Sequence, residues 1–322
     1  MNAGARLALY GAGVVVAFGA AFGLAQAIVP PSVVSEWTKG TEMEEHGAHG
    51  AATATATDDA ASAAADTLKG LSLSLEGYAL SPVEAPAGVD EPGELSFQIR
   101  DAHGTPVTEY TTAHDKDLHL IVVRSDGSAF RHVHPTLDET TGTWSLPWEW
   151  DAAGTYRVFA DFTPAGPDAP SLTLTQTVQV AGEFAPVTPE PTQVAQVDGF
   201  TVSLDGALEA ASASDLTFTL TKDGSPVTGL EPYLGAFGHL VALREGDLAY
   251  LHVHAAGDEP KSGETSGPEI AFAAEAPTAG RYLLYLDFQV DGVVHTAEFV
   301  LDAAAPAGDA PASDDDAHDD GH

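Results

Sequence analysis

The sequence predicts an all-β protein that contains two tandem β-sandwiches. Apolar and polar residues alternate with the period of two typical of strands in LSLSL (71–75), LTLTQTVQV (172–180) and LTFTL (216–220). Gly, Asp and Pro interrupt this alternation about every 8–12 residues, which is the spacing of turns in a sandwich. After residue 30, no segment has the 3.6-residue period of an amphipathic helix.

The first element is an apolar segment without charges, residues 7–24, which follows Arg6. With its apolar extension it has roughly the ~20 residues that span a bilayer. The preceding positive charge predicts a cytoplasmic N-terminus, with the rest of the chain outside. Because Ala25-Gln26-Ala27 is a cleavage pattern, residues 1–29 are either a single-pass transmembrane anchor or a signal peptide. We therefore expect the domains outside the cell membrane, anchored there or secreted.

Composition divides the remainder of the chain into five parts. A stretch rich in Ala, Thr, Asp and Glu is expected to be a disordered tether, FAPVTPEPT is expected to lie in a linker, and the end DDDAHDDGH is expected to be a disordered acidic tail. The predicted parts are the tether 30–66, the first sandwich 67–182, the linker 183–195, the second sandwich 196–302 and the tail 303–322.

The two sandwiches are predicted from an internal duplication. Three segments of the first copy, LSFQIRDAHGTPV (95–107), DLHLIVVRSDGSAFRHVHP (117–135) and AGTYRVFADF (153–162), recur in the same order in the second as LTFTLTKDGSPV (216–227), FGHLVALREGDLAYLHVHA (237–255) and AGRYLLYLDF (279–288). About seven strands per copy favour an immunoglobulin-like or cupredoxin-like sandwich. In the third segment of each copy, the Gly-x-Tyr pattern predicts a tyrosine that packs inward.

Composition excludes several classes of function. With 48 acidic and 12 basic residues, the net charge of −36 repels phosphate, so nucleic acid is excluded as a partner while cations are favoured. The absence of cysteine excludes disulfides, thiolate zinc sites and blue-copper centres. Since Met1 and Met43 are the only methionines, a thioether site for Cu(I) is also disfavoured.

Six of the 13 histidines occupy matching positions in the two copies: His119, His132 and His134 in the first, and His239, His252 and His254 in the second. In the first copy, Asp126-Gly127 predicts a two-residue type I′ hairpin. That turn pairs His119 with His134 and places His132 diagonally on the same face.

In the second copy, Gly246-Asp247 predicts an equivalent hairpin. It pairs His239 with His254 and again places His252 diagonally. Directly opposed Cβ atoms are ~5 Å apart and diagonal ones about 7–8 Å. Three imidazoles at these separations can bind one ion with bonds of ~2 Å. The sequence therefore predicts one three-histidine site per domain, for Cu(II) or Zn(II); the alternative is a set of solvated or hydrogen-bonded surface histidines.

Asp161 and Asp287 lie five residues after Tyr156 and Tyr282. Each is a candidate fourth ligand or an acceptor that orients a ligating imidazole. The alternative is an ordinary acidic surface residue, which Arg157 would pair with in the first copy. The remaining histidines have no such pattern. Weak metal capture or neutral composition is expected for His46, His49, His318 and His322, and solvated positions for His103, His114 and His295.

HLIVVRSDGSAFRHVHP and HLVALREGDLAYLHVH resemble segments of secreted or membrane-anchored bacterial proteins, of actinobacterial type, that carry H…HxH β-domains. They are loosely similar to YtkA-like and cupredoxin-like modules. The resemblance covers roughly two thirds of the chain and implies metal handling. Ala255 stands where the first copy has Pro135, a departure expected to affect the turn after the ligands and not the ligands.

The leading hypothesis is a non-catalytic, extracytoplasmic metal-binding protein that sequesters or delivers its ion, with an envelope transporter as a candidate partner. The alternative is a cell-surface interaction module without metal. A hydrolytic zinc or copper redox enzyme is the third reading, disfavoured because no repeated glutamate stands as a general base.

Overall fold

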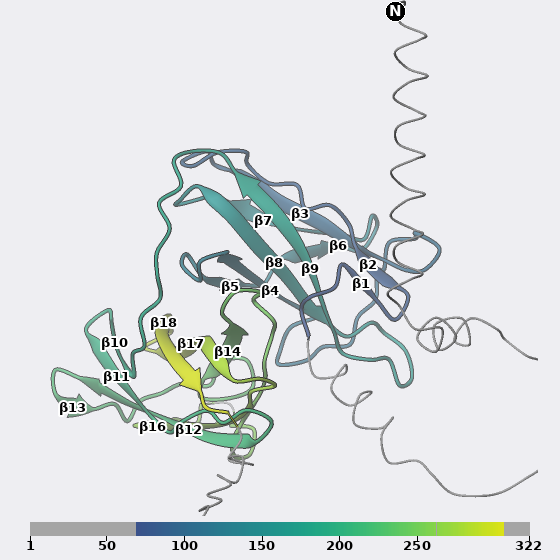
Figure 1. Ribbon diagram of the computed structural model, residues 1–322. Coiled ribbons are helices and arrows are strands. Elements are labelled where there is room, and N and C mark those ends of the chain that lie inside the picture. The colour runs from purple at the N-terminus through teal and green to yellow at the C-terminus, as the bar shows by residue number, and fades with distance from the viewer. Residues whose placement is uncertain (1–68, 262, 306–322) are drawn as a thin grey trace, which may run out of the picture. The chain divides into compact units, whose positions relative to one another are not determined.

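The computed structural model describes residues 69–261 and 263–305, which form only strands, turns and loops (Figure 1). The predicted N-terminal segment, the tether and residues 306–322 of the tail lie outside the described part, as does the side chain of His252. Among the described residues, no helix is long and apolar enough to cross a membrane.

The first sandwich, domain 1, consists of a five-stranded sheet in the order β1-β2-β3-β7-β6 and a four-stranded sheet in the order β5-β4-β8-β9. Its strands are β1 (Ser74–Leu75), β2 (Tyr78–Leu80), β3 (Gly93–Arg100), β4 (Leu118–Arg124), β5 (Arg131–Val133), β6 (Thr136–Asp138), β7 (Thr143–Trp148), β8 (Gly154–Phe162) and β9 (Leu172–Val180).

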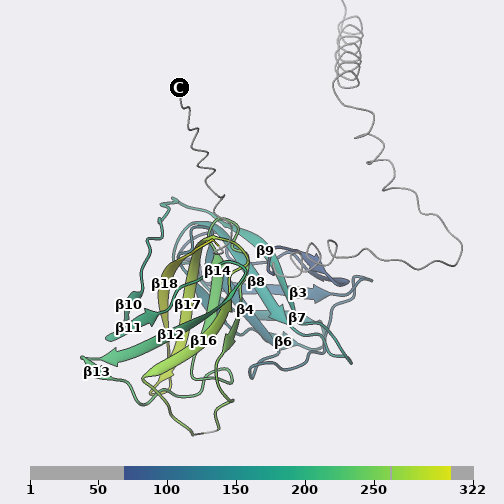
Figure 2. The same cartoon turned by 60° about the horizontal axis from the view of Figure 1, so that its bottom comes forward.

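Domain 2 repeats this arrangement, with β10-β11-β12-β16-β15 in one sheet, where β13 also pairs with β12, and β14-β17-β18 in the other (Figure 2). Its strands are β10 (Val194–Val197), β11 (Phe200–Asp205), β12 (Ala213–Lys222), β13 (Ser225–Pro226), β14 (His239–Arg244), β15 (His252–Ala255), β16 (Glu269–Glu275), β17 (Gly280–Val290) and β18 (Val293–Ala303). Each domain thus has nine strands in the described part, short ones included, against about seven expected.

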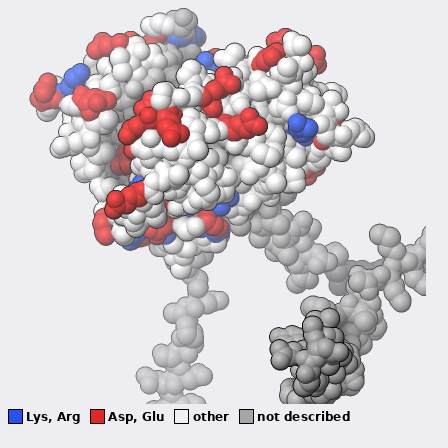
Figure 3. All heavy atoms as spheres, turned by 90° about the horizontal axis from the view of Figure 1, so that it is seen from above, with Lys and Arg blue, Asp and Glu red and all other residues white. Residues whose placement is uncertain are grey.

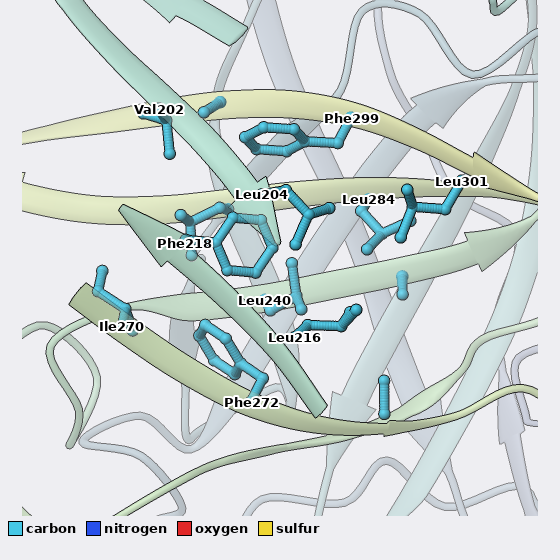
Figure 4. Packing of buried hydrophobic residues seen from close by; sticks show 14 of the residues in the cluster. Val202, Leu204, Leu216, Phe218, Leu240, Ile270, Phe272, Leu284, Phe299 and Leu301 are labelled. Atoms are coloured by element: carbon cyan, nitrogen blue, oxygen red, sulfur yellow. The ribbon is translucent and has the colours of Figure 1, made fainter. Parts of the chain in front are cut away.

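Each domain has its own apolar core between its two sheets. In domain 2, Phe218 and Phe272 of one sheet face Leu284 and Phe299 of the other (Figure 4). The inward tyrosines are confirmed: Tyr156 and Tyr282 are buried, and each hydroxyl donates to the carbonyl four residues upstream at 2.8 Å. This contact is the tyrosine corner of immunoglobulin-like sandwiches.

A third apolar cluster joins the two domains, because every residue of β4 is buried. Leu120 and Val122 face the core of domain 1, while the alternate residues face domain 2. The interdomain cluster contains Ile121, Val123 and Phe159 of domain 1 and Val241, Leu243, Leu248, Leu283 and Tyr285 of domain 2. The sequence of a strand buried on both faces is a nearly continuous apolar run, and LHLIVVR of β4 fits this description.

Two sequence expectations differ from the structure. Only Ser74–Leu75 of the LSLSL segment forms a strand, and its leucines are exposed. The predicted linker, 183–195, is hydrogen-bonded to both domains: Arg124 donates to the carbonyl of Ala185, and Arg281 donates to that of Pro189. β10 begins inside it.

Candidate metal centre

The first hairpin has the predicted pairing but a different turn. The N–H of Gly127 donates to the carbonyl of Arg124, and Gly127 has a φ of 83°, so the loop is a three-residue turn that ends in a left-handed glycine. Arg124 then pairs with Ser128 across the turn. Ala129, with a φ of 52°, is an extra residue on one strand, and this bulge restores the expected register.

The register places the first set of histidines as expected. Ile121 pairs with His132, and Leu120 pairs with Val133. One step further along the same ladder brings His134 opposite His119. The expected type I′ turn is wrong, yet the face that it assigned to the histidines is right.

The second hairpin begins in the predicted register and then leaves it. Leu243 bridges Tyr250, and the N–H of Leu251 donates to Ala242. From His252 onward the chain pairs with β16 instead of β14, so His254 lies opposite Ala273 and not opposite His239. The expected pairing of His254 with His239 across one hairpin is therefore wrong.

The two copies differ in sequence at this point, where Ala255 stands in place of Pro135. In domain 1, pairing with β7 starts after Pro135, at Thr136. In domain 2, Ala255 lies inside β15, and the ladder with β16 already starts at His252. The second copy therefore departs from the first at the candidate ligands as well as after them.

Four histidines from both domains form one cluster, which we call the histidine cluster: His119, His132, His134 and His239. His119 Nδ1 lies 3.1 Å from His132 Nε2 and 3.2 Å from His134 Nε2. The His239 ring stacks on that of His119 with 5.6 Å between centroids and lies 4.9 Å from that of His132. Ligand nitrogens of His119, His132 and His239 all lie within 4.8 Å of one another.

These separations suit a metal ion. Nitrogens bound at ~2.0 Å around a tetrahedral ion lie roughly 3.3 Å apart. His119 Nε2 faces the carbonyl of Ala113 at 3.1 Å, and His132 Nδ1 faces Asp287 Oδ2 at 2.8 Å. If both outer nitrogens carry protons, the lone pairs of His119 Nδ1 and His132 Nε2 point toward each other, ready for a cation.

Proton counting shows why this arrangement is unusual without a cation. The chain from Ala113 through His119 and His132 to Asp287 has three contacts, and each needs one proton. Two neutral imidazoles supply only two. Burial lowers the pKa of His132 to about 3 and raises that of Asp287 to about 7. The third proton resides on Asp287, or His134 Nε2 donates to His119 Nδ1 in place of His132, or a cation lies between the rings.

The cluster is mostly shielded from water. His119 is 5% exposed, and His132, His134 and His239 are partly buried. Burial lowers the pKa of all four imidazoles, to about 3 for His134 and well below the usual value for His239. Neutral imidazole is the form that binds metal.

The two candidate aspartates have different surroundings. Asp287, paired with His239 across β14 and β17, orients the imidazole of His132 and is not a surface residue. Asp161, paired with His119, accepts a hydrogen bond from Thr173, and burial raises its pKa. Arg157 does not form the expected pair with Asp161 but donates to the carbonyl of Asp247.

One of the other histidines requires a correction, His295. His114 lies in an exposed loop, as expected, but its ring is 6.1 Å from that of His119 and 5.8 Å from that of His239. No spacing in the sequence signals this approach. His295 is buried and bonded to Asp198 at 2.7 Å. His103 is exposed, and the histidines of the tether and tail lie outside the described residues.

A cavity of about 810 Å³ adjoins the histidine cluster. His119 and His239 form part of its wall, together with His114, His254 and Asp161. Acidic side chains also outnumber basic ones on the surface shown in Figure 3.

A family model described as "Domain of unknown function (DUF8832)" matches residues 74–182 and, a second time, residues 195–305, together more than half of the chain. The internal duplication is thereby confirmed. No curated protein matches the chain.

Several solved structures are similar to the chain at low identity. Invasin, a bacterial integrin-binding protein, has 13% identity and a TM-score of 0.21, over 71% of this chain and 39% of invasin. The S-layer protein SbsC, domains 4 and 5, has 10% identity and a TM-score of 0.22, over 73% of this chain and 98% of the SbsC structure. The ectodomain of mouse nectin-like molecule 4 has 13% identity and a TM-score of 0.19, over 73% of this chain and 67% of the ectodomain structure.

The chain thus spans about two fifths of the length of the invasin structure. TM-scores at this level carry no argument about ligand or partner. Neither the family model nor these structures is a YtkA-like or cupredoxin-like module, so that part of the resemblance stays a prediction.

Proposed function

The chain belongs to this family, whose description names no function, and we propose from the histidine cluster that the protein binds one Cu(II) or Zn(II) ion between its two domains. The observation that carries the proposal is the convergence of ligand nitrogens from His119, His132 and His239 within 4.8 Å. A donor set of imidazoles alone suits both ions, with copper favoured by intrinsic affinity.

The ligands in this proposal come from both domains. His119 and His132 supply two nitrogens from β4 and β5, and His239 supplies a third from β14. His134 is the candidate fourth ligand because its Nε2 lies 3.2 Å from His119 Nδ1. This replaces the expected two sites, one per domain, with a single shared site.

The proposed role is sequestration or delivery rather than catalysis. We place the protein outside the cell membrane because residues 1–29 have the sequence of an anchor or a signal peptide. An envelope transporter that supplies or receives the ion is the proposed partner.

Calorimetric titration of the full chain with Cu(II) and with Zn(II) at neutral pH tests the proposal. One equivalent is expected, lost in both His119→Ala and His239→Ala and retained in His103→Ala, which removes an exposed histidine outside the cluster. Two equivalents, each lost only on mutation of its own domain, would restore one site per domain. No binding would refute metal binding.

A second function, a protein-interaction module, is favoured by one feature of domain 1. Leu71, Leu73 and Leu75 expose 37%, 49% and 44% of their surface beside the short strand β1. An exposed apolar row near a sheet edge is a site for partner strands. This function would be favoured if the wild-type chain bound neither ion but bound an envelope protein, and if Leu73→Asp abolished that binding.

A further inference from the structure

We propose that the cavity beside the histidine cluster is the route by which the hydrated ion enters, with His254 and His114 as transfer ligands along it. This inference rests on the proposed metal-binding function and adds a path and a direction of approach to it. The ligand class is a hydrated divalent cation.

The cavity meets the cluster on one side. Its described lining includes His119 and His239 but neither His132 nor His134. An ion in the cluster would therefore be reached from the cavity past His119 and His239. Liquid water takes roughly 30 Å³ per molecule, so a cavity of about 810 Å³ admits an ion with its hydration shell.

Two further imidazoles lie on this route. His254 of β15 and His114 of the loop before β4 are both exposed and both line the cavity. The His114 ring lies about 6 Å from two rings of the cluster, 6.1 Å from His119 and 5.8 Å from His239. In the proposed path, His114 passes the ion to the cluster by exchange of one nitrogen ligand for the next.

The divergence of the second hairpin gives His254 this position. Because β15 pairs with β16, His254 lies on the cavity wall and not opposite His239. The two copies of the H…HxH pattern therefore have different uses: the first copy supplies three histidines to the cluster, and the second supplies His239 to the cluster and His254 to the approach.

The charges of the cavity wall favour a cation. Lys69 is the only Lys or Arg in the described lining, which carries five carboxylates: Asp161, Asp258, Glu259, Glu264 and Glu269. A concave surface lined by one sign of charge concentrates ions of the opposite sign and accelerates their association. The effect decreases with ionic strength.

Stopped-flow measurement of Cu(II) binding to the full chain tests the path. Association is monitored by the quenching of tryptophan fluorescence, and dissociation is measured by capturing the released ion with excess EDTA. In His114→Ala/His254→Ala, the association and dissociation rate constants are expected to fall together, by about fivefold or more, with Kd changed by less than about twofold. His103→Ala is the matched control and should leave both rates unchanged.

The outcomes separate this inference from the proposed function. A wild-type chain that binds no Cu(II) refutes both. Normal binding with unchanged rates in the double variant refutes the path alone. Faster dissociation with a weaker Kd would make the two histidines direct ligands and also overturn the transfer role.

Variants of the carboxylates on the cavity wall provide a second, independent test of the path, through the rate of association. Asp258→Asn/Glu259→Gln/Glu264→Gln should slow association about threefold or more at low ionic strength and little at high ionic strength. Glu94→Gln/Glu139→Gln/Glu183→Gln changes the net charge equally on exposed positions outside the cavity lining. Equal slowing by both triple variants would show an effect of total charge and contradict the path.

Discussion

His132 Nδ1 lies 2.8 Å from Asp287 Oδ2, although the two residues are 155 positions apart and belong to different domains. Asp287 is 2% exposed, and its other oxygen accepts a hydrogen bond from Thr296 at 2.6 Å. Domain 2 thereby fixes the orientation of an imidazole that belongs to domain 1. An ion bound by His132 is positioned by both domains.

Asp287→Asn is expected to weaken Cu(II) and Zn(II) binding about 10–100-fold, because the carboxylate that orients a metal-binding imidazole also raises its basicity. Calorimetric titration measures the change. Asp198→Asn is the matched control, since Asp198 makes a similar contact of 2.7 Å with His295 outside the cluster. Equal losses of affinity in the two variants would contradict the assigned role of Asp287.

The close approach of the domains at Gly127 gives a second prediction. Gly127 has a φ of 83°, and a Cβ there would lie 2.3 Å from Leu283 Cδ1. Gly104 has nearly the same φ, 79°, but nothing within 4 Å of that position. Both Gly→Ala variants lose about 1–2 kcal/mol from the left-handed backbone, and Gly127→Ala should lose about 1–3 kcal/mol more from the clash.

Urea unfolding of the full chain measures this difference. Gly104→Ala serves as the control because it separates the backbone term from the clash with Leu283. If the two variants lost the same free energy of unfolding, the domains would not be in tight contact at this turn.

Asp126 predicts a dependence of stability on pH. Burial alone would raise its pKa, but hydrogen bonds from Arg124, Val187 and Ser128 outweigh burial and lower the pKa from 3.8 to about 2. Because the pKa is lower in the folded state, the ionised carboxylate stabilises the fold above pH 3.8. That stabilisation is lost as the pH falls through about 2.

Asp126→Asn should therefore reduce the free energy of unfolding by about 1–3 kcal/mol at neutral pH, the range for charge-assisted hydrogen bonds, and by much less near pH 2. Urea titrations at the two pH values measure the change. Asp223→Asn, which removes a carboxylate at an exposed turn, is the control for the loss of one negative charge. A loss for Asp126→Asn that is equal at both pH values would exclude ionisation as the cause.

Much of domain 1 could be predicted from sequence because local pattern determines it. The alternation in LTLTQTVQV corresponds to β9, Leu172–Val180. The pairing of Leu120 with Val133 follows from the apolar pattern. This pairing is predicted correctly although the turn type is not, because the bulge at Ala129 restores the register.

The rest depends on contacts between segments far apart in the chain. Whether β15 pairs with β14 or β16 is decided by competing ladders, and the hairpin pattern of the second copy does not distinguish them. The burial of both faces of β4 is visible in the run LHLIVVR, but the run does not identify the covering strands. The approach of His114 depends on a loop whose residues have no periodic pattern.

An ion shared by the two domains should also stabilise their association, because only the folded, docked chain brings His239 to His119 and His132. At 100 times Kd, such an ion adds about 2.7 kcal/mol to the free energy of unfolding. Calorimetric unfolding with and without Zn(II) should show this shift in wild type and in His103→Ala, and its absence in His239→Ala. A full shift in His239→Ala would mean that His119, His132 and His134 hold the ion alone, so that the ion does not link the domains.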